Sequence, residues 1–376
     1  VVDGEAGVGK TRLAAEFDKF VDGLHLTVRR ARGRCLSYGQ GMGFWPLGEA
    51  VRAHLGLLEG DTGDVVLDAL EVALAEIIPD ESEREWLRAR LCVLLQGGSN
   101  ADFVHSELFV AWATWWQRVA EQRPVVLLIE DAHHADDGLL DFVEHLLATV
   151  TAPVLVVALA RPLLLERRPT IGGRRTTVVH LDPLDDETMS GLVDDLVTGL
   201  SGEEREALVQ RADGIPLFAV ETVRALIDRD LVVPRHGRYV VAEPTSLNLD
   251  EIGAPETLRA LIAARLDALP PDERSVVANA SVLGNTFTRA GLEALMPATR
   301  DLNPLLDSLQ RREIISVVHE RFTAERGQLR FVQTLVRQVA YSILSRRDRR
   351  SRHLAAAEHL ATLADADELS ALVAQH

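Results

Sequence analysis

The chain has few cysteines and no long hydrophobic run. Its 376 residues include 2 cysteines, Cys35 and Cys92, which lie far apart and in no metal-binding spacing. This excludes a disulfide scaffold and favours a reducing, cytoplasmic compartment. Both cysteines are expected to be small buried apolar residues. No window of about 18 uncharged apolar residues occurs, which excludes a membrane-spanning helix.

Basic residues are also in short supply. The chain carries 40 lysines and arginines against 57 acids, a formal net charge of -17 at pH 7. Wholesale binding to nucleic acid or to an anionic membrane needs a basic surface, so the composition disfavours both. An arginine-rich run from Arg321 to Arg352 is a local exception. Such a run is usually a solvated helix face and less often a docking patch.

The chain opens with a phosphate-binding motif. Gly4, Gly9, Lys10 and Thr11 fit the pattern G-x-x-x-x-G-K-[ST]. Glycines let backbone amides approach phosphate oxygens, and the following helix directs its positive end at the same charge. We expect Lys10 to reach the β- and γ-phosphate oxygens and Thr11 to bind Mg²⁺. The predicted nucleotide-binding residues here are Gly4, Glu5, Ala6, Gly7, Val8, Gly9, Lys10, Thr11 and Arg12.

This motif has the strand-to-helix context that a phosphate loop requires. Val1 and Val2 are typical of the end of a buried strand. A predicted helix follows, with apolar residues at helical spacing: Leu13, Phe17, Phe20, Val21 and Leu24. Because the sequence starts with Val inside this strand, we expect it to be a piece of a longer protein.

A second motif carries the predicted catalytic acids. The apolar run at 125–129 is typical of a parallel strand covered on both faces, and Glu130 and Asp131 follow it directly. One acid, Glu130, is expected to join Thr11 in holding Mg²⁺, and the other to position the attacking water. Another buried strand, at 153–160, ends at Arg161, which could sense the γ-phosphate or be a surface arginine.

The strands at 26–31 and 177–181 complete a predicted parallel, doubly wound α/β sheet in a nucleotide-binding domain spanning 1–182. Between 48 and 119 the pattern is helical, and Trp112, Trp115 and Trp116 are interpreted as core residues.

The segment at 133–137 contains two histidines and two aspartates. It could be mistaken for a metal cluster, but no further ligands are spaced to complete one. Asp136 or Asp137 more plausibly caps the next helix.

Beyond Pro183 the pattern predicts three further regions. A small all-α lid spans 183–232, with a capping box at Ser201 and Glu204 and a turn at 213–217 that contains Pro216. A polar, strand-like linker leads to a winged helix-turn-helix at 250–345, closed by a hairpin at 314–318 and 329–332. The start of a helical-repeat (TPR-like) region spans 346–376.

With these residues in place, the chain resembles the ATPase module of the STAND class, the signal-transduction ATPases with numerous domains. It is most similar to the AAA-type ATPase domain of bacterial regulators that carry adenylate cyclase or LuxR-type DNA-binding domains. The resemblance covers essentially the whole chain. It rests on the segments 4–13, 33–47, 130–136, 161–162, 214–217 and 331–341.

This resemblance implies an ATP/ADP switch with Mg²⁺, in which the lid and the winged helix close over the nucleotide. It implies that Pro216 contacts adenine and that Arg161 is a sensor residue. Three residues depart from the family pattern: Glu130 replaces a frequent Asp, His134 a Trp and Gln333 a His.

The sequence therefore predicts an ATP-binding, slowly hydrolysing switch that controls an output domain in cis, either a cyclase or a DNA-binding domain. Lys10, Glu130, Asp131 and Arg161 are its predicted catalytic residues. An unknown effector at the repeat arm, a nucleotide-dependent homo-oligomer and no membrane contact are expected. The alternative is a DNA-binding winged-helix ATPase of origin-recognition-like type, which the acidic balance disfavours. Two other enzyme classes are disfavoured. The sequence shows no acceptor site of the kind a P-loop kinase needs, and no metal-binding carboxylate pair of the kind an active cyclase needs.

Overall fold

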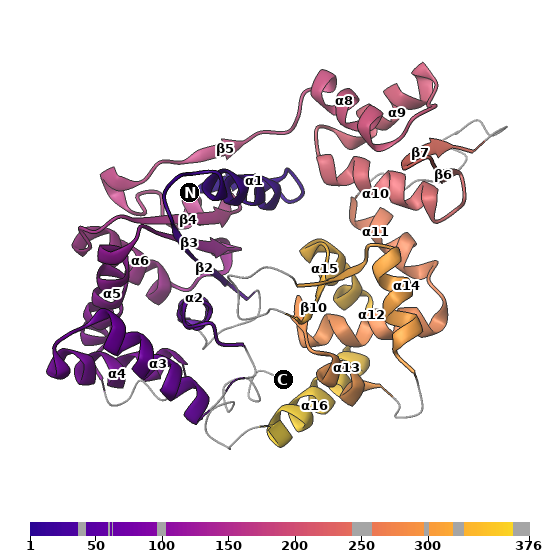
Figure 1. Ribbon diagram of the computed structural model, residues 1–376. Coiled ribbons are helices and arrows are strands. Elements are labelled where there is room, and N and C mark those ends of the chain that lie inside the picture. The colour runs from indigo at the N-terminus through magenta and orange to yellow at the C-terminus, as the bar shows by residue number, and fades with distance from the viewer. Residues whose placement is uncertain are drawn as a thin grey trace.

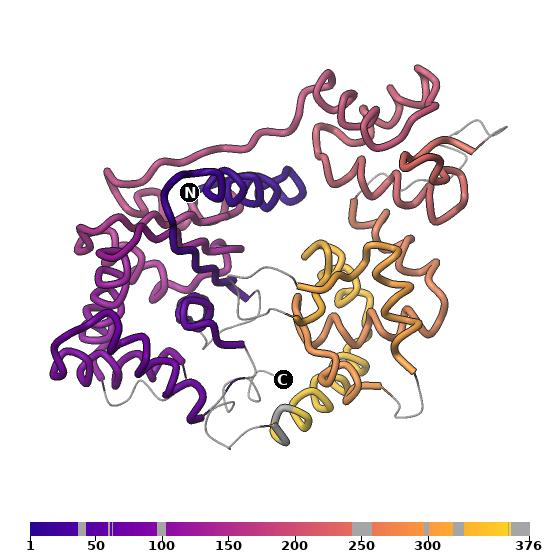
Figure 2. Tube along the Cα trace, viewed as in Figure 1, coloured from indigo at the N-terminus to yellow at the C-terminus, as the bar shows by residue number. Residues whose placement is uncertain are grey.

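The computed structural model describes residues 1–36, 43–58, 61, 63–95, 103–242, 258–296, 301–318 and 327–363. Three parts follow one another along the chain (Figure 1). We call them the α/β part (residues 1–181), the middle unit (residues 186–242) and the C-terminal unit (residues 258–363). An extended segment after the last strand of the α/β part leads to the middle unit, as the trace in Figure 2 shows.

A five-stranded parallel sheet forms the centre of the α/β part, in the order β2-β3-β4-β1-β5. Its strands are β1 (Val2–Gly4), β2 (Arg29–Arg34), β3 (Val125–Glu130), β4 (Val154–Ala160) and β5 (Val179–Leu181). β1 lies between β4 and β5, so the phosphate-binding motif starts from an interior strand. The predicted parallel α/β sheet is confirmed.

Helices cover both faces of this sheet (Figure 1). They are α1 (Lys10–Asp22), α2 (Trp45–Leu55), α3 (Asp64–Ile77), α4 (Glu81–Leu95), α5 (His105–Gln122), α6 (Asp137–Thr149) and α7 (Leu163–Arg167), with short 3₁₀ turns η2 (Ala132–His134) and η3 (Gly173–Arg175). Alternate residues of β3 divide between the faces, because side chains along a strand point to opposite sides. Leu127 joins the large core formed with α5 and α6, whereas Leu128 joins a small cluster with Ala14 of α1.

Two sequence predictions in this part need correction. In α1 the buried positions are Ala14 and Val21, whereas Leu13 and Phe20 are 40% and 64% exposed, so the helix rests on its smaller residues. β2 begins at Arg29, three residues later than predicted. This strand is polar, and acids from α1 compensate its charges, as in the 2.8 Å pair between Arg32 and Asp18.

The three tryptophans of α5 lie in the core, so the prediction that they are core residues is confirmed. Trp112, Trp115 and Trp116 are all fully buried. The indole nitrogen of Trp112 donates to the carbonyl oxygen of Arg90 at 3.0 Å, which anchors α5 to α4. Gly33 allows the neighbouring α2 to approach, because a Cβ there would lie 1.9 Å from the carbonyl oxygen of Pro46. The rest of the predicted passage at 33–47 lies partly outside the described residues.

The middle unit contains α8 (Asp186–Leu196), α9 (Gly202–Ala212) and α10 (Pro216–Ile227). The predicted capping box is present, with Ser201 and Glu204 each accepting from the other's backbone amide. The segment predicted as a polar, strand-like linker is part of this unit. An antiparallel hairpin of β6 (Val232–Arg235) and β7 (Arg238–Val241) buries Val232 and Val241 in the same core as the helices.

The C-terminal unit combines helices with a three-stranded sheet of order β8-β10-β9. Its elements are α11 (Leu258–Asp267), α12 (Pro271–Leu283), β8 (Thr286–Phe287), α13 (Arg289–Leu295), α14 (Asn303–Arg311), β9 (Ile315–Val317), β10 (Leu329–Phe331), α15 (Thr334–Ile343) and α16 (Arg346–Leu363). The predicted hairpin corresponds to β9 and β10, and β8 adds a strand that was not predicted.

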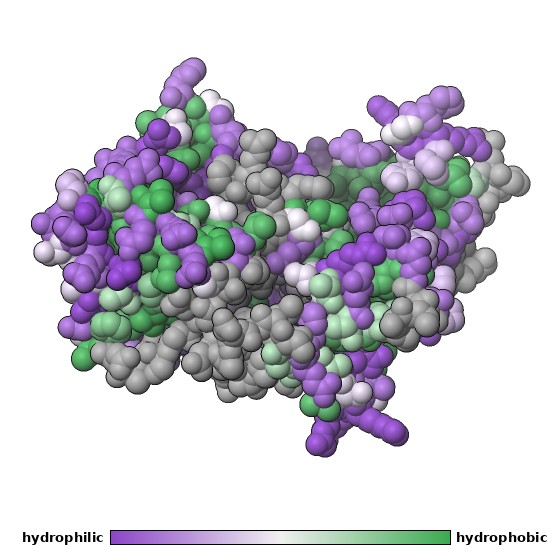
Figure 3. Space-filling model, turned by 60° about the horizontal axis from the view of Figure 1, so that its bottom comes forward, coloured by the Kyte–Doolittle hydropathy of each residue, from purple (hydrophilic) through white to green (hydrophobic). Residues whose placement is uncertain are grey.

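The helix expected to open a repeat arm packs back onto this unit. α16 contacts α12 and α13, and Arg352 donates to the side chain of Asn279 at 2.8 Å. The described part of α16 therefore has partner helices within the C-terminal unit. Residues 364–376 of the predicted arm lie outside the described residues. In the view of Figure 3, hydrophobic and hydrophilic side chains are interspersed over the surface.

Candidate nucleotide site

The phosphate-binding motif forms the turn between β1 and α1. Gly7 and Gly9 have φ angles of 87° and 116°, in the region that favours glycine. The ammonium of Lys10 donates to the carbonyl oxygens of Gly4 and Glu5 at 2.7 and 2.8 Å. Among the described residues, the amides of Gly7 and Gly9 meet no protein acceptor. This loop therefore offers amide donors and a lysine, which are the groups that phosphate oxygens require.

The other predicted loop residues differ in exposure. Val8 is buried, whereas Glu5, Thr11 and Arg12 are exposed and Ala6 is half-buried. Arg12 pairs with Glu16 at 2.8 Å, one helical turn further on. The Thr11 hydroxyl is thus accessible at the start of α1, as a Mg²⁺ ligand must be.

Three charged residues follow neighbouring strands beside this loop. Lys10 follows β1, Asp131 follows β3 and Arg161 follows β4, and these strands are neighbours in the sheet. Burial and the positive charge of Arg161 lower the pKa of Lys10, while the carboxylates of Asp131 and Asp3 oppose that shift. The carboxyl ends of parallel strands therefore converge on one charged point, as the sequence predicts.

Glu130 lies in a different environment from the acid that follows it. It is 5% exposed, and its carboxylate is paired with Arg34, and with Arg32 at 3.4 Å. Burial favours its neutral form, but the two guanidiniums outweigh burial and hold the pKa of Glu130 below its ordinary value. Because both guanidiniums already pair with the Glu130 carboxylate, it is not placed to bind Mg²⁺ directly in this arrangement. The exposed Thr11 is placed to do so.

Asp131 is the acid that lies near Lys10 and Arg161. Its backbone is left-handed, with φ of 52°, and its side chain is 30% exposed. Burial, assisted by the charge of Glu130, raises the pKa of Asp131, although Arg34 and Arg161 oppose the rise. A raised pKa makes a carboxylate a better proton acceptor at neutral pH.

Sequence reasoning missed the residues that support these acids. Arg32 and Arg34 lie on β2, whose register places Arg34 opposite Glu130. Alternating arginines in a strand were the available signal, but their partner depends on strand order. Asp3, buried under the loop, contacts the His180 ring at 3.0 Å, and neither residue stood out in the sequence.

The two histidines that follow Asp131 pack against each other. The rings of His133 and His134 lie 4.1 Å apart, and burial lowers the pKa of His133 to about 3. The described residues hold no cluster of three or more potential metal ligands. Asp136 caps α6 by accepting from the Leu139 amide at 2.8 Å, as predicted.

A comparison with protein families agrees with this geometry. Residues 1–157 match the family model of the AAA ATPase domain. The chain thus contains an AAA-type ATPase domain, and Lys10 and Asp131 both lie inside the matched residues. Arg161 lies just beyond them. The comparison with curated protein sequences gives no match.

Several solved structures are similar to this chain at low sequence identity. A STAND protein with a tetratricopeptide repeat sensor, from Pyrococcus horikoshii, is 16% identical over 96% of this chain, with a TM-score of 0.54. The chain spans 42% of the length of that protein. A Walker-type ATPase of Pyrococcus abyssi is 15% identical, with a TM-score of 0.38, over 90% of this chain and 89% of its own. Cdc6p of Pyrobaculum aerophilum is 12% identical, also at 0.38, over 92% and 88%.

The start of α10 touches the phosphate loop of the ATPase domain. The Leu217 amide donates to the carbonyl oxygen of Gly7 at 3.3 Å. A Cβ on Gly7 would lie 2.9 Å from the Leu217 Cβ, so only glycine allows this approach. Pro216, the predicted adenine contact, is the first residue of α10 and lies next to this hydrogen bond.

None of the described helices is long and apolar enough to cross a membrane.

Proposed function

We propose that this chain binds ATP and ADP with Mg²⁺ and hydrolyses ATP slowly, as a regulatory switch. The observation that carries this proposal is the convergence of Lys10, Asp131 and Arg161 at one edge of the parallel sheet. Two positive charges and one carboxylate of raised pKa suit in-line attack of water on a terminal phosphate.

Each residue has a distinct role in this proposal. Lys10 leaves the carbonyl oxygens of Gly4 and Glu5 and donates to phosphate oxygens instead. Asp131 accepts a proton from the attacking water, and Arg161 stabilises charge on the terminal phosphate. Thr11 would hold Mg²⁺, and Glu130 would add negative charge near it. Mg²⁺, when bound, neutralises charge on the β- and γ-phosphate oxygens.

Slow turnover follows from the state of Glu130. In many P-loop ATPases two acids share metal binding and water positioning. Here the first acid is engaged by Arg32 and Arg34, so Asp131 alone faces Lys10 and Arg161. A site in which only one of the two acids lies near Lys10 and Arg161 is expected to turn over slowly.

The regulatory part of the proposal rests on the contact between Gly7 and Leu217. A nucleotide on the phosphate loop would lie against α10, so the middle unit acts as a lid and Pro216 contacts adenine. We further propose that the C-terminal unit is a winged helix and that a repeat arm follows it. The STAND neighbour supports this by fold alone. An attached cyclase or LuxR-type output domain, an effector at the arm and a nucleotide-dependent homo-oligomer complete the proposed switch.

The test is nucleotide binding by the Lys10→Ala variant. Isothermal titration of ATP and ADP with Mg²⁺ should give micromolar or tighter binding to the wild type, and a loss of at least about 100-fold in the variant, since its charge-assisted bonds to phosphate are removed. Thermal unfolding of the two proteins should agree within a few degrees. Equal affinities would rule out the proposed phosphate site. Slow release of bound ADP would support a switch, and fast exchange with steady turnover would favour a constitutive ATPase.

A further inference from the structure

A second cleft lies away from the phosphate loop, between the middle unit and the C-terminal unit. Its volume is about 490 Å³, which is within the range of small-molecule sites. Leu196, Val220 and Ile227 form an apolar wall, and Tyr239 of β7 adds a ring that is 41% exposed. The facing wall is the end of α14, with Arg311 and neighbouring residues.

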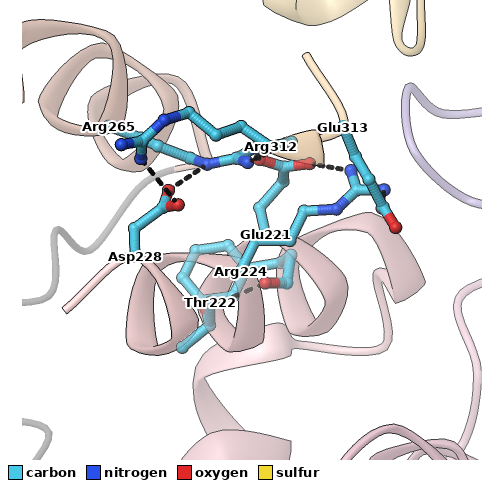
Figure 4. A network of polar contacts seen from close by, with 8 residues as sticks. Glu221, Thr222, Arg224, Asp228, Arg265, Arg312 and Glu313 are labelled. Atoms are coloured by element: carbon cyan, nitrogen blue, oxygen red, sulfur yellow. Dashed lines mark hydrogen bonds and ion pairs between the residues drawn. The ribbon is translucent and has the colours of Figure 1, made fainter. Parts of the chain in front are cut away.

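The floor of the cleft is a closed network of ion pairs (Figure 4). Glu221 of α10 is fully buried and accepts from Arg224 at 2.6 Å and from Arg265 at 2.9 Å. Asp228 holds Arg265 at 2.8 Å and Arg312 at 3.2 Å. These pairs fix the two walls relative to each other, because Glu221 of α10 and Asp228, which directly follows α10, each hold a guanidinium from the C-terminal unit.

Arg311 differs from the other arginines of the cleft. Arg224, Arg265 and Arg312 all have carboxylate partners, whereas Arg311 is exposed and forms no ion pair within the described part of the chain. Arg311 lines the cleft together with Arg312, whose side chain is 34% exposed. A planar guanidinium matches carboxylate and phosphate oxygens in a bidentate geometry.

We propose that this cleft binds a small aromatic anion. The acidic group pairs with Arg311, and the ring lies between Tyr239 and the apolar wall of α8 and α10. Apolar contact and aromatic stacking hold the body of the ligand, and the guanidinium selects for its charge. An uncharged ligand of the same shape gains only the first of these contributions.

The position of the cleft gives such a ligand a structural effect. One wall belongs to the middle unit and the other to the C-terminal unit, so a ligand that contacts both favours the arrangement described here. α10 also carries Leu217, which contacts the phosphate loop at Gly7. If the proposed nucleotide function holds, the ligand would slow nucleotide release. Binding of the ligand itself does not depend on that function.

Two fluorescent probes that differ in charge test the proposal. The first is 1-anilinonaphthalene-8-sulfonate, and the second is N-phenyl-1-naphthylamine, which has the same rings and no sulfonate. We expect Arg311→Gln to weaken binding of the sulfonate about tenfold, the loss of one charge-assisted contact, and to leave the uncharged probe unchanged. Tyr239→Ser should weaken both. Equal sulfonate binding by wild type and Arg311→Gln would overturn the proposal.

Matched variants separate this cleft from other probe sites. Arg350→Gln removes an exposed arginine of α16 and should leave both probes unaffected. Phe20→Ser tests whether the probe binds to the exposed face of α1, and Lys10→Ala tests whether it binds at the phosphate loop. Binding that depends on Arg311 should persist in both variants. If Phe20→Ser or Lys10→Ala removes that binding, the probe lies elsewhere and the proposal is wrong. Because Arg311 and Arg350 are exposed, both variants should melt like the wild type.

Discussion

At the scale of single residues, the two adjacent acids after β3 differ in what surrounds them. Glu130 is ionised and held by arginines from β2, whereas Asp131 has a raised pKa and lies near Lys10 and Arg161. Their order in the sequence gives no sign of this division. It arises because β2 lies on one side of β3 and β4 on the other.

Asp131→Asn should therefore stop hydrolysis and keep nucleotide binding. The amide has nearly the same shape as the carboxylate but cannot accept a proton from water. We expect turnover to fall about 100-fold or more, since general base catalysis contributes about 10²–10⁴-fold. Phosphate release under single-turnover conditions measures it, with ATP affinity from titration as the control. Lost affinity with intact turnover per bound ATP would show that Asp131 binds and Glu130 catalyses.

His54 predicts a pH dependence of stability. Burial, with a smaller contribution from the charge of Arg29, lowers its pKa to about 4, and its ring packs edge-on against Trp115 at 5.4 Å. The unfolded chain, with an ordinary histidine pKa, binds this proton more readily than the folded chain does. Stability from this group is therefore complete above about pH 6.5 and falls as the pH drops toward 4, by about 3 kcal/mol in total.

Urea unfolding between pH 7 and pH 4.5 measures this effect. His54→Phe should flatten the loss of stability over that interval, because phenylalanine takes up no proton. His25→Gln, at an exposed position, should leave the wild-type pH dependence unchanged. A His54→Phe protein with the wild-type slope would assign the pH dependence to other groups.

At the scale of elements, local sequence signals predicted most helices and not all strands. The capping box at Ser201 and the cap at Asp136 lie where their sequence patterns place them. β2 was misplaced because its arginines resemble a surface loop until the acids of α1 and β3 are beside them. The β6–β7 hairpin was interpreted as a linker, because only its packing on α10 shows that Val232 and Val241 are core. The phosphate loop was predictable because its residues are contiguous.

The ion-pair network between α10 and α11 gives a prediction at this scale. Glu221→Gln removes one buried charge and leaves the guanidiniums of Arg224 and Arg265 without their shared partner. Breaking a buried pair by removing one member typically costs about 3–5 kcal/mol. Urea denaturation should show a loss of that order.

An exposed ion pair provides the control for this variant. Asp194→Asn breaks a pair with Arg205 in which both side chains are about half exposed, at 54% and 45%. Its effect should stay below about 1 kcal/mol, because water screens exposed pairs. Similar losses for the two variants would mean that the buried network contributes no more than a surface pair.

At the scale of the whole molecule, Gly7 of the ATPase domain contacts Leu217 of the middle unit. Gly7→Ala places a methyl group against Leu217 at a backbone conformation that alanine resists. We expect about tenfold or greater loss of nucleotide affinity and faster proteolysis in the segment at 182–185, because α10 can no longer rest on the loop. Gly191→Ala, on α8 with open space around it, should change neither and should stabilise slightly.

The position of β1 inside the sheet also has a consequence for how the chain is made. Val2 pairs with Leu159 on one side and with Val179 on the other, so its two neighbours are synthesised long after it. At about 5–20 residues per second, ribosomes need roughly ten to forty seconds to reach them. Until then the phosphate loop has no strand to anchor it. The sheet of the ATPase domain can therefore be completed only after residue 181 has been synthesised.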